Sequence, residues 1–188
     1  RLKGLIMTNL DDLIIANNVF NHSDQPSDFL KGVHNLLEND GVYIFEQPDF
    51  AIGAMSLKFD QIYHEHVSYF TSKNIEGILK NNEFKLIDIR QNHYHGGSLR
   101  SIAVKKNSVK HQVMYNKKNF KKFDKIYNLI FFKRMMKKIN EKKSSFMKKI
   151  HLLKKNGYVI CGIGAGAKSN TFLTYYDLNN KLIKFLTD

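Results

Sequence analysis

Asp12-Leu-Ile-Ile-Ala16 is a short apolar run with polar residues on both sides, and a similar run follows at Val42-Tyr-Ile-Phe-Glu46. Their length and their β-branched residues are typical of strands that are buried in a parallel sheet. Pro48 ends the second run, because proline lacks the N–H that a strand ladder needs. The two runs therefore predict neighbouring strands of one sheet.

The segment between these runs predicts a helix. Ser27 or Asp28 can cap its N-terminus, and apolar residues then recur at helical spacing as far as about Glu38. Asp40-Gly41 marks its end. The order strand, helix, strand predicts part of a doubly wound α/β sheet, which binds ligands at the carboxyl ends of its strands.

Three polar residues follow the first predicted strand, namely Asn17, Asn18 and, four positions later, His22. They stand at the carboxyl edge of the predicted sheet, where an α/β protein holds its ligand. Two other interpretations remain open. The asparagines can be turn residues that simply follow a strand, and His22 can be a solvent-exposed neighbour of the helix cap.

The stretch Phe59-Asp-Gln-Ile-Tyr-His-Glu-His-Val-Ser-Tyr-Phe70 concentrates groups that move protons. Neutral imidazole accepts a proton near pH 7, and the carboxylate of Glu65 between His64 and His66 can raise the basicity of one of them. The phenol of Tyr63 can donate to an oxygen on which negative charge develops. The pattern favours a site that removes a proton from carbon beside a carbonyl group. The alternative is a polar loop with metal-binding potential or with solvated histidines.

Downstream of this stretch, Thr71 or Ser72 can cap a further helix. Residues 84–89 and 99–104 then have the composition of two strands, which we expect to be antiparallel partners at the sheet edge.

The loop His93-Tyr-His-Gly-Gly-Ser98 joins these two strands. Paired glycines permit positive φ and a close approach of the backbone to a ligand. Ser98 and Arg100 can hold a phosphate, for which the guanidinium fork is well suited. A hairpin turn without any ligand is the alternative.

Residues 112–155 predict one long helix or two shorter ones. A buried strand over Tyr158–Cys161, the turn Gly162-Ile-Gly-Ala-Gly-Ala167 and a helix to about Tyr176 follow. A glycine turn between a strand and a helix N-terminus can bind an anion, and Lys168 adds a positive charge there.

A second strand is predicted over Leu182–Leu186, with Asp188 directly after it. Strand, glycine turn, helix, strand and acid together are close to a dinucleotide fingerprint, in which Asp188 would bind a ribose hydroxyl. An NAD(P)-binding oxidoreductase that uses the Gly162–Ala167 turn is therefore an alternative function.

The net charge of +13 is concentrated in residues 105–155, which carry 18 of the 30 basic residues but only Asp124 and Glu141 as acids. A basic block can indicate a nucleic-acid-binding protein, which is a second alternative function. The block has no recognisable nucleic-acid-binding motif, and its aromatic residues recur at the spacing of a helix core face. We therefore expect a solvated helix face and no nucleic-acid partner.

The single cysteine, Cys161, argues against a disulfide framework and against a zinc site within this chain. The 188 residues contain neither a run of about 18 apolar residues nor a signal-peptide pattern. We expect a cytoplasmic protein without a membrane partner. The first residue is Arg1 rather than methionine, and the chain reads as an internal fragment.

Four motifs in order resemble the S-adenosylmethionine-dependent C-methyltransferases of nucleotide-linked 4-keto-deoxy sugars. They are Ala16-Asn-Asn-Val-Phe-Asn-His22, Tyr63-His-Glu-His66 with Ser68-Tyr-Phe70, His95-Gly-Gly-Ser-Leu-Arg100, and Gly162-Ile-Gly-Ala-Gly-Ala-Lys-Ser-Asn-Thr171. The resemblance covers nearly the whole chain. It implies an enzyme that methylates carbon 3 of a 4-keto-6-deoxy sugar through an enolate.

The resemblance also implies an organisation. Residues 1–106 would be the C-terminal part of a Rossmann-like methyltransferase domain, residues 107–155 a helical connector, and residues 156–188 the start of a second, incomplete Rossmann-like domain. The family's glycine loop for S-adenosylmethionine and its cysteine-rich zinc module would lie upstream of Arg1, so zinc is expected only there.

By resemblance, His66 is the candidate base, Glu65 orients or tunes the site, and Tyr63 and His22 steady the enolate oxygen. Asn17 and Asn18 would contact the methionine end of S-adenosylmethionine. The remaining family positions would bind the nucleotide-sugar; they are Ser98, Arg100, Gly164, Lys168 and Asn170.

Overall fold

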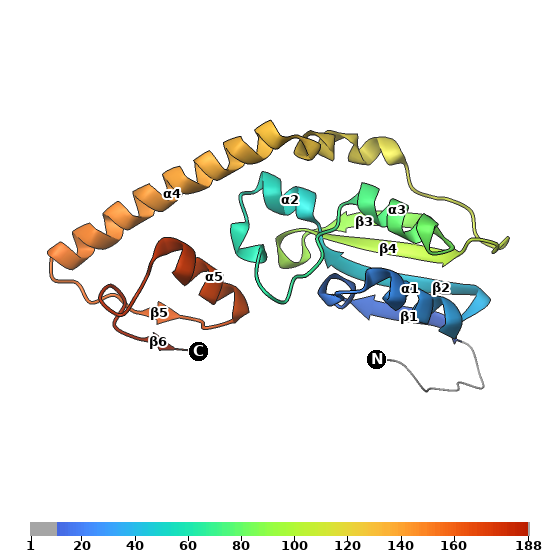
Figure 1. Ribbon diagram of the computed structural model, residues 1–188, viewed down its shortest axis with the longest axis horizontal. Helices are drawn as coiled ribbons and strands as arrows, with labels where there is room; N and C mark the ends of the chain where they lie inside the picture. The colour runs from blue at the N-terminus through green and yellow to red at the C-terminus, as the bar shows by residue number, and fades with distance from the viewer. Residues whose placement is uncertain (1–10, 188) are drawn as a thin grey trace. The chain divides into compact units, whose positions relative to one another are not determined.

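The computed structural model describes residues 11–187 of the chain, which form two compact units (Figure 1). The first unit contains the chain up to Gly53 together with Glu65–Asp124. The second contains Ala54–His64 together with the chain from Lys125 onward.

The first unit is built on a four-stranded mixed sheet with the strand order β1-β2-β4-β3 (Figure 1). Its strands are β1 (Asp11–Asn17), β2 (Leu37–Pro48), β3 (Phe84–Asn92) and β4 (Ser98–Lys105). β1 and β2 are parallel, whereas β4 is antiparallel to both β2 and β3. The predicted α/β fold, the parallel strand pair and the antiparallel pair are confirmed, whereas the burial predicted for the first strand is wrong, since Leu13 and Ile15 of the edge strand β1 are 52% and 58% exposed.

The strands predicted over residues 84–89 and 99–104 were both expected at the sheet edge, and this is wrong for the second of them, β4. β4 pairs with β2 from Val42 opposite Val104 to Pro48 opposite Ser98, so it lies inside the sheet and β3 alone forms the edge. Its small and apolar residues explain this position, since Leu99 and Ala103 are fully buried in the core. Adjacent strands in sequence need not share an edge.

Helix α1 (Pro26–Leu36) begins earlier than the sequence predicts. Gln25 stands at its N-cap and Pro26 in its first turn, so neither Ser27 nor Asp28 caps it. Proline is suited to the first helical position, because its fixed φ is helical and its missing N–H would have no partner there.

Strand β2 also begins earlier than predicted, directly after α1, so Asp40-Gly41 lies within the strand instead of ending the helix. The pairing of β1 with β2 is irregular here, with a register shift between Asp11 and Leu13. A side chain at Gly41 would come within 2.9 Å of the Asp11 carbonyl oxygen and of the Leu37 side chain. Glycine therefore serves the close approach of the two strands.

Helix α3 (Ser72–Asn81) is capped by Thr71, whose hydroxyl oxygen accepts from the Asn74 N–H at 3.3 Å, as predicted. The shorter helical pieces of the chain are α2 (Phe50–Met55) and single 3-10 turns over Phe20–His22, Phe59–Gln61 and Tyr94–Gly96.

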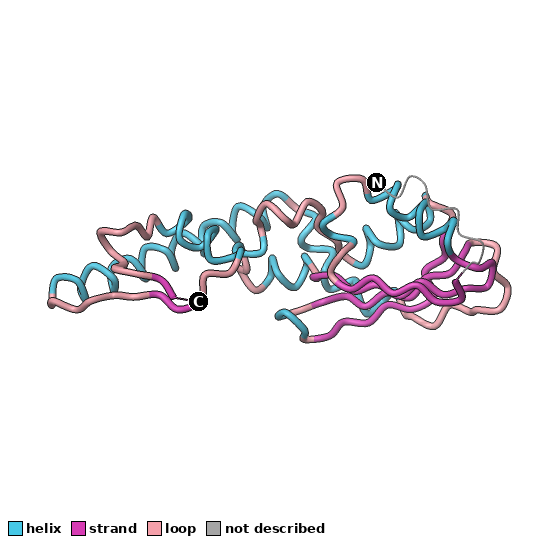
Figure 2. The backbone as a smooth tube through the Cα atoms, turned by 90° about the horizontal axis from the view of Figure 1, so that it is seen from below, coloured by secondary structure: helices cyan, strands magenta, loops and turns pink. Residues whose placement is uncertain are grey.

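Helices α1 and α3 cover one face of the sheet, and Figure 2 shows strands and helices as separate layers. The core between them contains fully buried residues from β2, from both helices and from the segment after β1; they include Tyr43, Phe45, Leu30, Ile75, Leu79 and Phe20. The Phe20 ring stacks on Phe70 at 4.8 Å and meets the edge of Phe45 at 5.4 Å. This aromatic cluster fixes the two segments that carry His22 and His66.

The second unit contains α4 (Leu129–Lys155), α5 (Ala167–Tyr176) and the parallel strands β5 (Gly162–Ile163) and β6 (Leu186–Thr187). A 3-10 helix over Lys117–Tyr127 precedes α4, which agrees with two helical segments in residues 112–155. Phe146 of α4 packs edge to face on Tyr176 of α5 at 5.0 Å. Phe59 also packs on α5, with its ring 4.5 Å from that of Tyr175.

The strands that were predicted over Tyr158–Cys161 and Leu182–Leu186 are largely wrong. β5 begins only at Gly162, and β6 contains Leu186 and Thr187 alone. The Lys184 N–H donates to the Ile160 carbonyl oxygen at 2.9 Å, so the two segments approach each other before Gly162, but Tyr158 and Val159 are 61% and 64% exposed and the predicted burial is wrong. Asp188 lies outside the described residues.

Within residues 11–187, none of the helices combines the length and the apolar composition that crossing a lipid bilayer requires.

Candidate functional site

The candidate site begins at the carboxyl ends of β1 and β2. Asn17 ends β1 opposite Glu46, and the N–H of Asn18 donates to the Glu46 carbonyl oxygen at 2.7 Å. Asn18 has φ 52°, a left-handed conformation that asparagine tolerates better than most residues. This turn leads the chain off the sheet into Phe20–His22, so both asparagines and His22 lie at one edge, as predicted.

His22 and His66 lie together in the first unit, with ring centroids 5.2 Å apart and perpendicular ring planes. His66 is 9% exposed, whereas His22 is half-buried. The two segments are joined by a backbone hydrogen bond, in which the Ser68 N–H donates to the Asn21 carbonyl oxygen at 3.1 Å. Two of the four predicted catalytic residues therefore meet, although 44 positions separate them in the sequence.

The other predicted catalytic residues lie where the chain passes from one unit to the other. Tyr63 belongs to the second unit and is half-buried, with its ring 5.9 Å from that of His64. Glu65 belongs to the first unit and is exposed. Both residues occupy a turn without regular secondary structure, and their catalytic roles stay predictions.

Tyr69, the last tyrosine of this stretch, lies in the first unit with its ring 5.3 Å from that of Phe50. Partial burial raises the pKa of the Tyr69 phenol, because desolvation disfavours the charged phenolate. Tyr69 is therefore a proton donor, not a base, at neutral pH.

The loop from His93 to Ser98 depends on its glycines. Gly96 and Gly97 have φ angles of 77° and 126°, as the paired glycines predict. A side chain at Gly97 would also come within 2.7 Å of Ile52. The backbone at Gly97 thus approaches the Ile52 side chain closely, and this contact packs the loop against the first unit.

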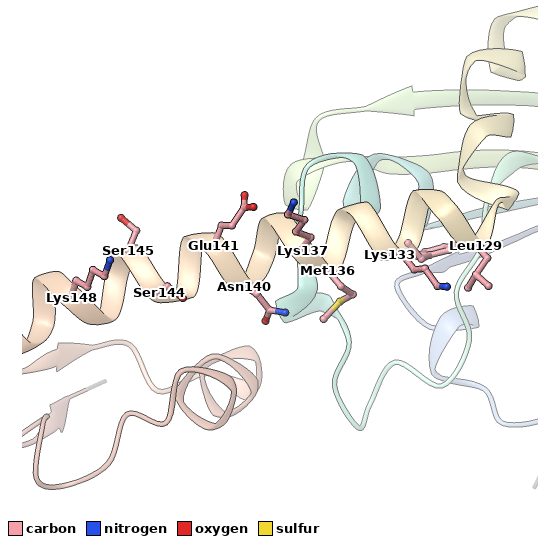
Figure 3. Close-up of a pocket in the computed structure, with 10 residues that line it drawn as sticks. Leu129, Lys133, Met136, Lys137, Asn140, Glu141, Ser144, Ser145 and Lys148 are labelled. Carbon is pink, nitrogen blue, oxygen red and sulfur yellow. The ribbon is translucent and has the colours of Figure 1, made fainter.

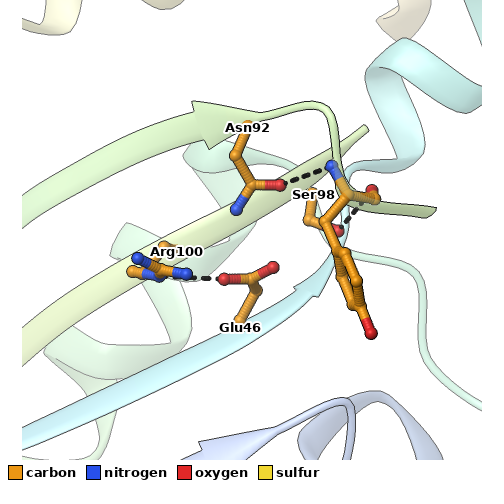
Figure 4. A network of polar contacts seen from close by, with 5 residues as sticks. Glu46, Asn92, Ser98 and Arg100 are labelled. Atoms are coloured by element: carbon orange, nitrogen blue, oxygen red, sulfur yellow. Dashed lines mark hydrogen bonds and ion pairs between the residues drawn. The ribbon is translucent and has the colours of Figure 1, made fainter. Parts of the chain in front are cut away.

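Polar contacts within this loop are shown in Figure 4. The Asn92 Oδ1 atom accepts from the Tyr94 N–H at 2.9 Å, and the Ser98 hydroxyl donates to the Tyr94 carbonyl oxygen at 3.0 Å. Ser98 is fully buried and holds the turn. The Arg100 Nε donates to Glu46 Oε2 at 2.9 Å, while 59% of the Arg100 side chain stays exposed.

The register places four polar residues in one row across the sheet. Asn17 is opposite Glu46, Glu46 is opposite Arg100, and Arg100 is opposite Arg90. Arg90 is held by Asp88, with its Nε 2.7 Å from Asp88 Oδ2. Glu46 is the member of this row that the sequence did not identify as a site residue, and its position just before Pro48 at a strand end was the available signal.

Two buried amides lie close to the histidine pair in the fold. The side chains of Asn21 and Gln47 are 2% and 0% exposed, and in the described part of the chain neither amide forms a hydrogen bond. Asn21 directly precedes His22, and Gln47 lies two positions beyond Phe45, which contacts Phe20. Buried polar atoms without partners are rare, and they are a feature of functional sites. Neither residue was predicted.

The second unit presents the glycine turn between β5 and α5. A side chain at Gly162 would collide with Leu186 of β6, so this glycine serves strand packing. Gly164 has φ 90°, and Gly166 is the N-cap of α5, with open space where side chains would lie at both positions. Lys168 and Asn170 occupy the first turn of α5, where free backbone N–H groups can meet an anion.

An open groove of about 940 Å³ follows α4 in the second unit (Figure 3). Its labelled lining residues, among them Lys133, Lys137 and Lys148, all come from this one helix. None of the predicted site residues lines it. The groove is a surface of this one helix.

Within residues 11–187, no three His, Cys, Asp or Glu side chains gather closely enough to hold a metal ion.

Comparison with known proteins gives two family matches. Residues 93–188 match the model of the C-methyltransferase C-terminal domain, and residues 11–89 match a methyltransferase domain. The C-methyltransferase NovU of Streptomyces niveus is 30% identical over 87 residues, which are 46% of this chain and 21% of NovU. The chain thus spans about a fifth of this relative.

Solved structures with a similar arrangement are more distant. One is a methyltransferase from Clostridium acetobutylicum that is described as S-adenosylmethionine-dependent and is 15% identical. The match covers 54% of this chain and 61% of the Clostridium chain, with a TM-score of 0.42. The 1,6-didemethyltoxoflavin-N1-methyltransferase of Burkholderia thailandensis, with bound S-adenosylhomocysteine, is 19% identical, covers 51% and 44%, and has a TM-score of 0.40.

Proposed function

Because the chain belongs to the C-methyltransferase family through its residues 93–188, we propose that it takes part in S-adenosylmethionine-dependent methylation of carbon 3 of a nucleotide-linked 4-keto-6-deoxy sugar. The observation that carries the proposal is the His22–His66 pair at the carboxyl edge of the sheet. The pair stands in motifs that resemble those of the sugar C-methyltransferases.

The chemistry requires a base and a group that steadies negative charge. A 4-keto group acidifies the neighbouring C–H, so a base can remove that proton and leave an enolate. The enolate carbon then forms a bond with the methyl carbon while the methyl–sulfur bond breaks, and its electron pair stays on sulfur as a neutral thioether. S-adenosylmethionine supplies the electrophilic methyl group for this step.

His66 is the proposed base. The residue is almost buried, and the Ser68–Asn21 backbone hydrogen bond joins its segment to that of His22, so one ring nitrogen is proposed to accept the proton from carbon. His22 stands edge-on to it and is proposed to donate to the enolate oxygen, with Tyr63 as a second donor. Glu65 is proposed to tune the basicity of the site.

The residues at the ends of β1 and β2 fit the methionine end of the cofactor. Asn17 and Asn18 have amide donors and acceptors, while the neighbouring Glu46 is buried and its carboxylate pairs with Arg100. Ammonium, carboxylate and sulfonium groups need such partners. We therefore assign Asn17 and Asn18 to cofactor binding.

The nucleotide-sugar is proposed to contact two groups of residues. In the second unit, Gly164, Lys168 and Asn170 surround the N-terminus of α5, which suits a diphosphate. In the first unit, Arg100 lies two positions after Ser98 and keeps 59% of its side chain exposed. Because Ser98 is buried, we propose that it shapes the loop that presents Arg100 to the substrate.

The proposal is tested first by calorimetric titration of the full gene product with S-adenosylmethionine and, separately, with NAD. We expect S-adenosylmethionine alone to bind, and methyl transfer to follow when 4-keto-sugar nucleotides are added. Binding of NAD alone would instead support an oxidoreductase built on the Gly162–Ala167 turn and would refute the proposal.

A further inference from the structure

Asp49 lies at a junction of the first unit and is not one of the candidate site residues. It directly follows β2 and is 2% exposed. The segments around it carry two parts of the candidate site, namely the residues up to Phe70 and the loop from His93 to Ser98. Asp49 forms a hydrogen bond to the loop and is the β-bridge partner of Phe70.

The carboxylate of Asp49 accepts hydrogen bonds from two other elements, α2 and β3. Its Oδ1 accepts from the Ala51 N–H at 2.9 Å, and its Oδ2 accepts from the Gln91 Nε2 at 2.7 Å. Gln91 belongs to the edge strand β3, whereas Asp49 follows β2. Because β4 begins only at Ser98, the Asp49–Gln91 bond connects β2 to β3 across the loop that leads into β4.

The backbone of Asp49 makes the remaining connections. Its N–H donates to the Gly97 carbonyl oxygen at 3.0 Å. Asp49 also forms a parallel bridge with Phe70, where the Phe50 N–H donates to the Phe70 carbonyl oxygen at 2.9 Å. Asp49 and Phe50, neighbours in the chain, therefore tie the Gly97 loop and the end of the His66 segment to the end of β2.

A buried carboxylate is costly unless its position is fixed by donors. An apolar residue would fill the same space without this cost, but it could not reach the Gln91 amide. The buried carboxylate thus lowers the stability of the fold, but it defines the geometry between the Phe70 segment and the His93–Ser98 loop. Neither Asp49 nor Gln91 touches the histidine pair, so any role in the reaction is one of positioning.

We propose that Asp49 and Gln91 form a brace that holds the Glu65–Phe70 segment and the His93–Ser98 loop in register for methyl transfer. The inference rests on the proposed function, since it assigns both segments to the substrate site. The brace acts on the placement of the sugar between His66 and Arg100 and leaves the cofactor end of the site, at Asn17 and Asn18, unchanged.

The test compares Gln91→Leu with Gln112→Leu, a matched change at an exposed glutamine outside the brace. Hydrogen exchange in this chain is followed at the Asp49 and Phe50 amides, with the Phe29 amide of α1 as the internal reference. We expect Gln91→Leu to speed exchange at the Asp49 and Phe50 amides by roughly tenfold or more, because the free energy of the local opening that exposes these amides falls. Phe29 and the Gln112→Leu control should stay unchanged.

The second readout is the reaction of the full gene product. Gln91→Leu should lower kcat by roughly 10- to 100-fold, because a misplaced substrate reacts slowly, with an unchanged Kd for S-adenosylmethionine. Asp49→Asn should restore most of the rate that Asp49→Leu loses, since an asparagine still accepts from Ala51 and can pair with a reoriented Gln91 amide.

Unchanged exchange at Asp49 and Phe50 in Gln91→Leu would overturn the brace, as would faster exchange that includes Phe29, which reports general destabilisation. Local exchange without any fall in kcat would overturn the positioning role. If the unaltered protein transfers no methyl group, the proposed function fails, and the exchange data alone decide whether the brace exists.

Discussion

The imidazole rings of His22 and His66 pack edge to face at the carboxyl edge of the sheet, with their centroids 5.2 Å apart. In the sequence the two residues are 44 positions apart. Neither residue belongs to a long helix or to a strand, and the Phe20–Phe70 stack of 4.8 Å beneath them holds both segments. Aromatic packing between the two segments that carry His22 and His66 thus positions the imidazole rings, although neither residue lies in a long helix or a strand.

The histidine pair should behave as one unit in catalysis. His66→Ala should lower methyl transfer by the roughly 10²–10⁴-fold that a general base contributes, and His22→Ala should lower it by a smaller factor. Because the groups act together, the double variant should lose less than the product of the single losses. Single-turnover methyl transfer in the full gene product measures each rate.

His151→Ala is the matched control for this cycle, because His151 is an exposed histidine on α4. It should leave the rate unchanged. A His66→Ala protein that keeps its rate within a few-fold of normal would contradict the assignment of the base, and fully multiplicative losses would contradict the coupling.

Gly97→Ala should destabilise the first unit. The residue has φ 126°, and a methyl group there would lie 2.7 Å from Ile52, so the change adds both backbone strain and a steric clash. The expected loss is about 1–3 kcal/mol of unfolding free energy, measured by urea denaturation.

Gly77 provides the opposite case in the same unit. It lies within α3 with no atom within 4 Å of the position that a side chain would occupy. Gly77→Ala should therefore stabilise the chain by about 0.5–1 kcal/mol, because alanine has the higher helix propensity. Equal effects of the two substitutions would show that the Gly97 geometry is not required.

The sequence predicted those elements whose signals are local. β1, α3 and the helix after the glycine turn follow from apolar spacing, a threonine cap and glycine, and each is found where expected. The start of α1 was missed because Pro26 at the first helical position competes with the capping signal of Ser27.

The remaining features depend on pairing between distant segments, which local patterns do not contain. The insertion of β4 between β2 and β3 places Glu46 opposite Arg100 and brings Gln91 to Asp49. Tyr158–Cys161 has the apolar composition of a strand and accepts one backbone hydrogen bond, from Lys184 to Ile160, but the regular ladder begins at Gly162, so composition alone placed the strand too early. The histidine pair was predicted from motif resemblance, whereas the amides of Asn21 and Gln47 had no signal in the sequence.

Lys168→Ala should weaken the binding of a nucleoside diphosphate to the full gene product. The lysine stands in the first turn of α5, where its charge adds to that of the helix N-terminus. Loss of one charge contact to a phosphate should weaken Kd by roughly tenfold, measured by calorimetry with a nucleoside diphosphate. Lys181→Ala, an exposed lysine outside the turn, is the control. Equal affinities of the two variants would contradict the proposal that the diphosphate binds at the N-terminus of α5.

The Asp49 carboxyl should make stability depend on pH in a defined direction. Burial raises its pKa above the ordinary value of 3.8, and the hydrogen bonds from Gln91 and Ala51 offset that rise only in part. The folded state therefore keeps a proton that the unfolded state has already released. Stability from this group is fully present below pH 3.8 and is lost as the pH rises through the folded-state pKa.

Asp49→Asn removes this titration while it keeps the shape of the side chain. The unfolding free energy of the unaltered chain minus that of Asp49→Asn should fall as the pH rises from 3 toward neutrality, in urea titrations at a series of pH values. Asp28→Asn is the control, since Asp28 is exposed at the start of α1. A difference that stays flat or rises with pH would mean that the donors around Asp49 outweigh its burial, and the carboxylate would then be a source of stability instead of a cost.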